Sequence, residues 1–90
     1  MIKIIYSGPY KKKEKKFIKN HPDIVGQYEK TFKLLEMNPY HPSLRLHKLT
    51  GKLSDLYSVS INITYRLSIE FIIQEDQIIP VDIGTHEEVY

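Results

Sequence analysis

The stretch YSVSINITYRLSIEF, residues 57–71, decides the fold because apolar and polar side chains alternate along it. The apolar positions are Tyr57, Val59, Ile61, Ile63, Tyr65, Leu67, Ile69 and Phe71. A period of two is typical of half-buried β-strands, and Thr64 lies where the chain would reverse. We therefore predict a short hairpin with one continuous polar face, formed by Ser58, Ser60, Asn62, Arg66, Ser68 and Glu70.

The sequence predicts two further strands. Residues 77–84 alternate in the same way, with an apolar side formed by Ile79, Val81 and Ile83. Pro80 cannot donate a ladder hydrogen bond, so it indicates an edge or an irregularity there, and Asp82 is expected opposite the apolar side. At the N-terminus, residues 2–6 read IKIIY and are followed by the turn-forming sequence SGP, which suits a short strand.

Between these segments lie two stretches with helical periodicity. The first, residues 10–19, has a narrow apolar stripe among six lysines, formed by Tyr10, Phe17 and Ile18. The second, residues 22–37, has a clearer apolar face formed by Ile24, Tyr28, Phe32 and Leu35. A proline suits the first turn of each helix, and Asn38-Pro39 is expected to end the second.

The order of strand, helix, helix and three strands predicts an α+β fold, with the helices segregated from a mainly antiparallel sheet. Ninety residues are the size of one domain, and we expect a single domain over residues 1–90. The absence of cysteine excludes a disulfide scaffold, a thiolate metal site and a thiol nucleophile. No apolar run approaches the ~20 residues of a membrane helix, and the N-terminus lacks the order of a signal peptide, so we expect a soluble cytoplasmic protein.

The net charge of +2 conceals a dipolar distribution. Residues 1–52 contain twelve basic and four acidic residues, a net charge of +8, whereas residues 53–90 contain only Arg66 and seven acidic residues, a net charge of −6. Six lysines within ten residues make a positive field that would attract RNA, although a solvated helix face is the simpler interpretation. The candidate RNA-binding residues are Lys11, Lys12, Lys13, Lys15, Lys16, Lys19, Arg45 and Lys48.

Three further residues could carry chemistry. His86 follows the last predicted strand, and strand ends often carry function. His47 stands among basic neighbours, which disfavour the imidazolium form and would help a general base. By position alone, a solvated surface group is the simpler interpretation of both histidines. Arg66 offers a fork-shaped guanidinium suited to a phosphate, but it could instead pair with Glu70 or Asp82.

An ordered series of short segments runs through the second half of the chain: HKLTG at 47–51, LYSVSI at 56–61, YRL at 65–67, IGTH at 83–86, and Tyr90. Together they resemble the C-terminal half of the RelE/ParE toxin superfamily, with the strongest likeness to the YafQ branch of RelE-type ribosome-dependent mRNA endonucleases. The strand and helical hairpin before residue 40 also fit that fold. The resemblance implies a toxin of a type II toxin–antitoxin pair that enters the ribosomal A site and cuts the bound mRNA.

The resemblance also implies site residues, because His47, Arg66, His86 and Tyr90 match the motif positions of the family. Metal-independent RNA cleavage needs a base for the 2′-hydroxyl proton, a cation for the phosphorane and an acid for the leaving 5′ oxygen. We assign His47 as the base, Arg66 as the cation and His86 as the acid. Tyr90 would stack on a nucleobase or orient the phosphate, and no cofactor is expected.

The chain departs from its relatives at several strand positions. It has Ser58 and Ser60 where RelE has lysines, and Ile61 and Tyr65 where the YafQ branch has a histidine and an aspartate. The alternative is therefore a ParE-like toxin, in which the same fold inhibits DNA gyrase and cuts nothing, or an inactive binding protein. Either toxin implies a cognate antitoxin as partner, and an endonuclease also implies the ribosome and mRNA; no membrane or small-molecule partner is expected.

Overall fold

The computed structural model describes residues 2–53 and 55–85. Within this part of the chain one strand, two helices and four strands follow one another, so the predicted α+β class is confirmed. The elements are β1 (Lys3–Ile4), α1 (Gly8–Asn20), α2 (Val25–Met37), β2 (His47–Lys48), β3 (Tyr57–Ser60), β4 (Tyr65–Ile72) and β5 (Gln77–Thr85). Neither described helix has the length and apolar composition needed to cross a bilayer.

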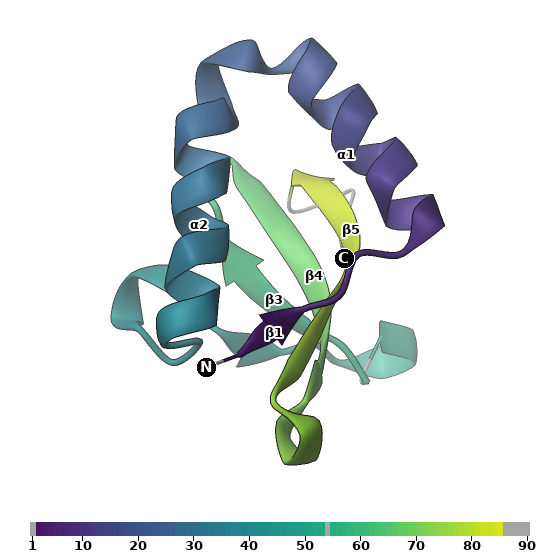
Figure 1. Ribbon diagram of the computed structural model, residues 1–90, viewed down its shortest axis with the longest axis vertical. Helices are drawn as coiled ribbons and strands as arrows, with labels where there is room; N and C mark the ends of the chain where they lie inside the picture. Colours follow the sequence, from purple (N-terminus) through teal and green to yellow (C-terminus); the bar gives the residue numbers. More distant parts are fainter. Residues whose placement is uncertain (1, 54, 86–90) are drawn as a thin grey trace.

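The strands of the described residues form one sheet in the order β1-β5-β4-β3-β2 (Figure 1). β1 pairs parallel with β5, and the other neighbouring strands pair antiparallel. Both helices pack against the same face of this sheet, because a single core joins Tyr10 and Phe17 of α1 and Leu35 of α2 to Leu67 and Ile69 of β4. The opposite face of β3 and β4 is covered by neither helix.

The helices form largely where the sequence predicts them. α1 begins at Gly8, and Ser7 caps it, because the Ser7 Oγ accepts a hydrogen bond of 3.2 Å from the backbone N–H of Tyr10. α2 begins after a 3₁₀ turn at Pro22–Ile24 and ends at Met37, as expected. The predicted helix positions that are buried are Tyr10, Phe17, Ile24, Tyr28, Phe32 and Leu35, which confirms both apolar faces.

The hairpin between β3 and β4 is shorter than predicted. β3 ends at Ser60, and the residues after it form the turn, so Ile63 is 99 % exposed instead of lying on the apolar face. Asn62 leaves the polar strand face for the same reason. Its Oδ1 accepts the backbone N–H groups of Thr64 (2.9 Å) and Tyr65 (2.7 Å), a local arrangement that competes with continued strand pairing.

β5 contains the irregularity that Pro80 indicates. The register against β4 shifts between Ser68 and Ile69, and Val81 has no pairing partner there. One extra residue on a strand reverses the alternation of the side chains beyond it. The buried positions are therefore Ile78, Pro80 and Ile83, and the half-buried ones are Ile79 and Val81, so the predicted apolar side is correct only for Ile83.

A buried chain of hydrogen bonds joins the two helices. The hydroxyl oxygens of Tyr10 and Tyr28 are 2.6 Å apart, and the Tyr28 hydroxyl donates to Glu14 Oε2 at 2.5 Å. Because Tyr28 gives its only hydroxyl proton to Glu14, Tyr10 is the donor to Tyr28. Burial is the main cause that raises the pKa of both tyrosines, so both hydroxyls stay protonated at neutral pH.

We expect Tyr28→Phe to lower the free energy of unfolding by about 1–3 kcal/mol, because it leaves the buried Tyr10 hydroxyl without its acceptor and Glu14 without its donor. Urea denaturation followed by circular dichroism measures this loss. Tyr40→Phe is the matched control, since Tyr40 is 63 % exposed, and it should change stability by less than about 0.5 kcal/mol. Equal losses in the two variants would contradict a stabilising role for the network.

Candidate functional site

A row of paired residues crosses four strands on the sheet face that the helices leave uncovered. The row, named here the His47 row, consists of His47, Ser58, Ser68 and Asp82, each opposite the next on the neighbouring strand. Directly opposite residues of antiparallel strands project to the same face, so His47 shares this face with the polar side chains of β3 and β4. The sequence did not predict β2, and this two-residue strand is what joins His47 to the sheet.

A second row lies two residues further along β3 and β4. In this Arg66 row, Ser60 is opposite Arg66, and Arg66 is opposite Gly84. From the usual strand separation and rise per residue, the Cα atoms of His47 and Arg66 are about 12 Å apart. That span lets the two side chains reach toward a phosphodiester group between them.

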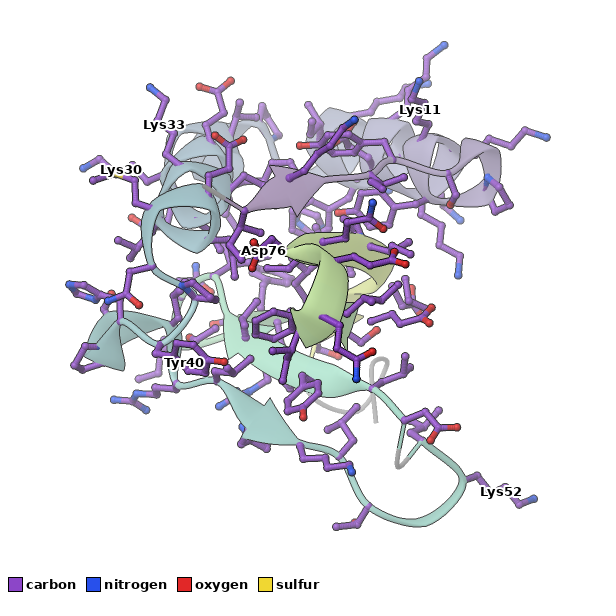
Figure 2. All side chains as sticks on the ribbon, turned by 60° about the horizontal axis from the view of Figure 1, so that its bottom comes forward. Lys11, Lys30, Lys33, Tyr40, Lys52 and Asp76 are labelled. Atoms are coloured by element: carbon purple, nitrogen blue, oxygen red, sulfur yellow. The ribbon has the colours of Figure 1, made fainter. Side chains whose placement is uncertain are left out.

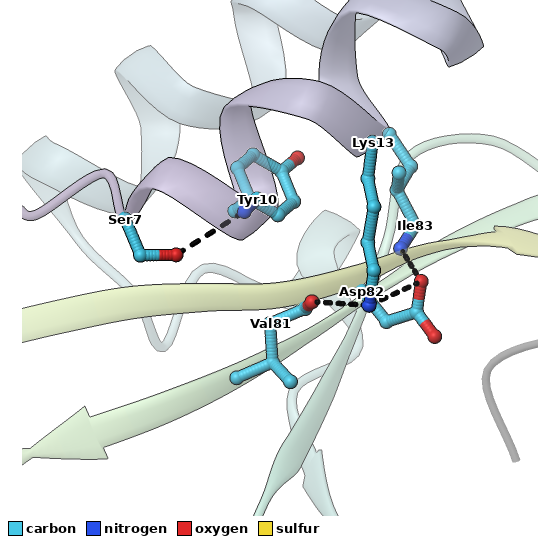
Figure 3. A network of polar contacts seen from close by, with 6 residues as sticks. All are labelled: Ser7, Tyr10, Lys13, Val81, Asp82 and Ile83. Atoms are coloured by element: carbon cyan, nitrogen blue, oxygen red, sulfur yellow. Dashed lines mark hydrogen bonds and ion pairs between the residues drawn. The ribbon is translucent and has the colours of Figure 1, made fainter.

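The Arg66 guanidinium contains an unsatisfied donor. Its Nη1 is shielded from solvent without a hydrogen-bond partner, and Arg66 forms no ion pair within the described residues. The alternative of a structural pair with Glu70 or Asp82 is therefore contradicted. Asp82 instead lies 3.7 Å from Lys13 Nζ and accepts the N–H of Ile83 at 2.9 Å (Figure 3). A shielded cationic donor without a partner costs free energy, and a phosphate oxygen would satisfy it.

The uncovered face is polar, as the sequence suggested, but its central part is buried. Ser58 and Ser68 are 0 % exposed, and neither Oγ has a hydrogen-bond partner. The Ser60 hydroxyl donates to the carbonyl of Asn62 at 2.9 Å. Two small buried serines thus lie between an exposed His47 at one side and a half-buried Arg66 at the other.

The backbone orients the His47 ring. Its Nδ1 is 3.1 Å from the carbonyl oxygen of Arg45. A carbonyl oxygen only accepts, so Nδ1 carries a proton and the neutral ring has its lone pair on Nε2. Arg45 is in the left-handed conformation (φ 50°) at the end of the 3₁₀ turn Pro42–Leu44, which sets the direction of that carbonyl. This tautomer is the one that a general base acting through Nε2 requires.

The other predicted basic residues lie on different surfaces. Arg45 and Ser60 line one groove of about 450 Å³, so Arg45 flanks the Arg66 row. Lys48 is the next residue of β2 after His47 and projects to the opposite side of the sheet. The α1 lysines, all exposed, are Lys11, Lys12, Lys13, Lys15, Lys16 and Lys19. Figure 2 shows Lys11 projecting away from the body of the protein, on the far side of α1 from the sheet.

Two of the predicted site residues, His86 and Tyr90, lie outside the described residues, and their roles stay predictions. Of the strand positions at which relatives differ, Ile61 is buried in the core and Tyr65 packs edge-on against Phe17. Both therefore belong to the helix-covered side of the sheet. Within residues 2–53 and 55–85, no group of three or more His, Cys, Asp or Glu side chains is arranged to hold a metal ion.

This architecture, with an uncovered sheet face next to a helical hairpin, is the fold of the RelE-superfamily toxins, which confirms the predicted resemblance at the level of the fold. The solved structure of YafQ from E. coli strain BL21(DE3) matches with a TM-score of 0.80 and 20 % sequence identity, covering 100 % of this chain and 99 % of that one. A metal-bound toxin from Helicobacter pylori matches with a TM-score of 0.74 and 27 % identity over 100 % of both chains. The YoeB–YefM complex from Staphylococcus aureus matches with a TM-score of 0.72 and 22 % identity, covering 96 % of this chain and 98 % of that one. No family model matches the sequence, and no curated protein matches it.

Proposed function

We propose that this protein is the toxin of a type II toxin–antitoxin system and that it cleaves mRNA on the ribosome. The pairing register is the observation that carries the proposal, since it puts His47 and Arg66 on one uncovered sheet face. An oriented histidine near a shielded, unpaired guanidinium is an arrangement typical of acid–base and phosphoryl chemistry. A protein that only binds a partner has no need of it, and this favours the nuclease over the gyrase inhibitor.

In the proposed reaction the RNA supplies its own nucleophile. His47 Nε2 takes the 2′-hydroxyl proton, O2′ attacks the adjacent phosphorus, and Arg66 stabilises the negative charge that gathers on the phosphorane oxygens. The bond from phosphorus to O5′ then breaks, and His86 donates a proton to O5′. The products are a 2′,3′-cyclic phosphate and a 5′-hydroxyl end. Tyr90 stacks on a nucleobase beside the cut bond.

The partners follow from the same proposal. A cognate antitoxin covers the toxin, in line with the S. aureus neighbour, which was solved as a YoeB–YefM complex. The exposed lysines of α1 meet ribosomal RNA, where their local positive field favours binding in a salt-dependent way. Lys48 adds to this basic surface from β2, and Arg45 contacts RNA beside the Arg66 row.

Induced expression of the chain without an antitoxin should arrest bacterial growth within minutes and produce cleaved transcripts. Primer extension on translated mRNAs should find new 5′ ends inside reading frames, and these should be absent from a matched transcript that lacks a ribosome-binding site and start codon and is therefore not translated. Intact mRNA together with stalled replication would contradict the nuclease and favour gyrase poisoning. Normal growth and intact mRNA would contradict both kinds of toxin.

A further inference from the structure

A groove of about 250 Å³ lies between α1 and the edge of β5, at the margin of the face with His47 and Arg66, where Asp82 of the His47 row reaches Lys13 of α1. Its base is apolar, because Phe17 and Ile83 are both buried. Its polar lining comes from the second half of α1 and the residue after it, namely Lys13, Lys16, Asn20 and His21, and from Asp82 of β5. The groove therefore combines an apolar base with a rim rich in hydrogen-bond donors.

The charge in this groove is positive once the internal ion pair is counted. Lys13 Nζ lies 3.7 Å from Asp82 Oδ1 and donates to the Val81 carbonyl at 3.4 Å, so Lys13 and Asp82 offset each other (Figure 3). Within the described residues Lys16 has neither a hydrogen bond nor an ion pair. The carbonyl end of α1 would by itself disfavour an anion, so the attraction for one comes from Lys16.

His21 is held in one orientation at the end of the groove. Its ring packs against two aromatic rings, with centroid distances of 4.6 Å to Phe17 and 4.8 Å to Tyr65, and those two rings also contact each other. Its Nδ1 is 3.3 Å from the Tyr65 hydroxyl oxygen. The other ring nitrogen, Nε2, lies on the far edge of the ring from this contact, and His21 lines the groove. Packing thus holds this second ring nitrogen in a groove that Lys16 also lines.

Gly84 connects this groove to the proposed catalytic face. It is a lining residue of the groove, and it is also the partner of Arg66 in the Arg66 row. Neighbouring strands are about 4.8 Å apart, and glycine has no side chain to block the passage over β5. An extended polyanion bound at Arg66 can therefore cross the β5 edge at Gly84 and reach Lys16 and His21.

We propose that the groove between α1 and β5 binds a second backbone phosphate of the same mRNA strand, one or two linkages from the bond that is cut. Lys16 neutralises this phosphate, and His21 and Asn20 donate hydrogen bonds to it. The inference rests on the proposed nuclease function and adds to it the path of the substrate. It also divides the α1 lysines, since Lys16 contacts the substrate strand and Lys11 does not.

Single neutral linkages in the mRNA test this path. The ribosomes are loaded with an mRNA that has a 2′-deoxyribose at the cleavage position, which prevents the cut. Each mRNA in the set contains a single methylphosphonate in place of one phosphate, at one of the two linkages on either side of the cleavage position. We expect one of these replacements to weaken binding of the wild-type toxin to the loaded ribosome about fivefold, which corresponds to the free energy of one partly exposed ion pair. Lys16→Ala should lose this sensitivity at that linkage and keep the wild-type response at the others.

His21→Phe is the second variant, because it preserves the ring packing while removing both nitrogens, and it should show the same selective loss. Lys30→Ala removes one exposed charge from α2, outside the groove, and should keep the wild-type pattern. If Lys16→Ala and His21→Phe respond to every neutral linkage as wild type does, the groove proposal is wrong while cleavage of unmodified mRNA still upholds the nuclease. If the wild-type chain neither binds nor cuts ribosome-bound mRNA, the proposed function fails and the groove proposal fails with it.

Discussion

Arg66→Ala should slow single-turnover cleavage of ribosome-bound mRNA by about 10²- to 10³-fold, the usual cost of removing one group that stabilises transition-state charge. Strands β3, β4 and β5 contain no other basic side chain that could replace it. Arg66 is the only basic residue between residues 53 and 90, and its Nη1 has no protein partner in the described residues. Binding of the toxin to the ribosome should weaken less than cleavage does, because the scissile phosphate already carries one charge in the ground state and the additional phosphorane charge exists only in the transition state.

Arg66 should also lower the stability of the free protein. A shielded guanidinium donor without an acceptor is unfavourable in the free protein, so Arg66→Met, which keeps a long apolar stem, should unfold at an equal or higher temperature than wild type. Lys52→Ala is the control for loss of charge alone, since Lys52 is exposed on a surface loop (Figure 2) and should leave cleavage unchanged. Wild-type cleavage by a folded Arg66→Met protein would contradict the role of Arg66.

The alternation in residues 57–71 was sufficient to predict β3, β4 and their shared polar face, because a period of two fixes which side chains lie together once two strands pair. The proximity of Ser60 and Arg66 follows from that pattern. The alternation did not reveal that Ser58 and Ser68 are fully buried, since burial depends on the neighbouring strands on both sides. The family resemblance, confirmed by the fold, pointed to His47 in a segment without any periodicity.

Features that depend on distant pairings could not be predicted. β2 has only two residues, and it is a strand only because β3 lies beside it. The extra residue at Val81 depends on the β4–β5 register, which also moves Ile79 away from its expected side. The groove at Lys16 and His21 requires α1 to lie along β5, and that contact joins the two ends of the chain. Short-range patterns contain no information about such contacts.

His47→Ala should reduce cleavage by about 10²- to 10⁴-fold, the usual contribution of one positioned proton-transfer group. The Arg45 carbonyl holds the proton on His47 Nδ1, so Nε2 is the basic atom. His41→Ala is the matched control, because His41 is an exposed histidine of the same connecting segment whose ring contacts Ser43, and it should cleave at the wild-type rate.

A substrate with sulfur in place of the bridging O5′ should separate the two histidines. A thiolate leaves without first being protonated far more readily than an alkoxide, because thiols are much stronger acids than alcohols. The sulfur substrate should therefore restore most of the cleavage lost in His86→Ala and little of that lost in His47→Ala, which still lacks a base for the 2′-hydroxyl. Rescue of His47→Ala alone would reverse the assignment and make His47 the acid. Equal rescue of both variants would contradict separate roles for the two histidines.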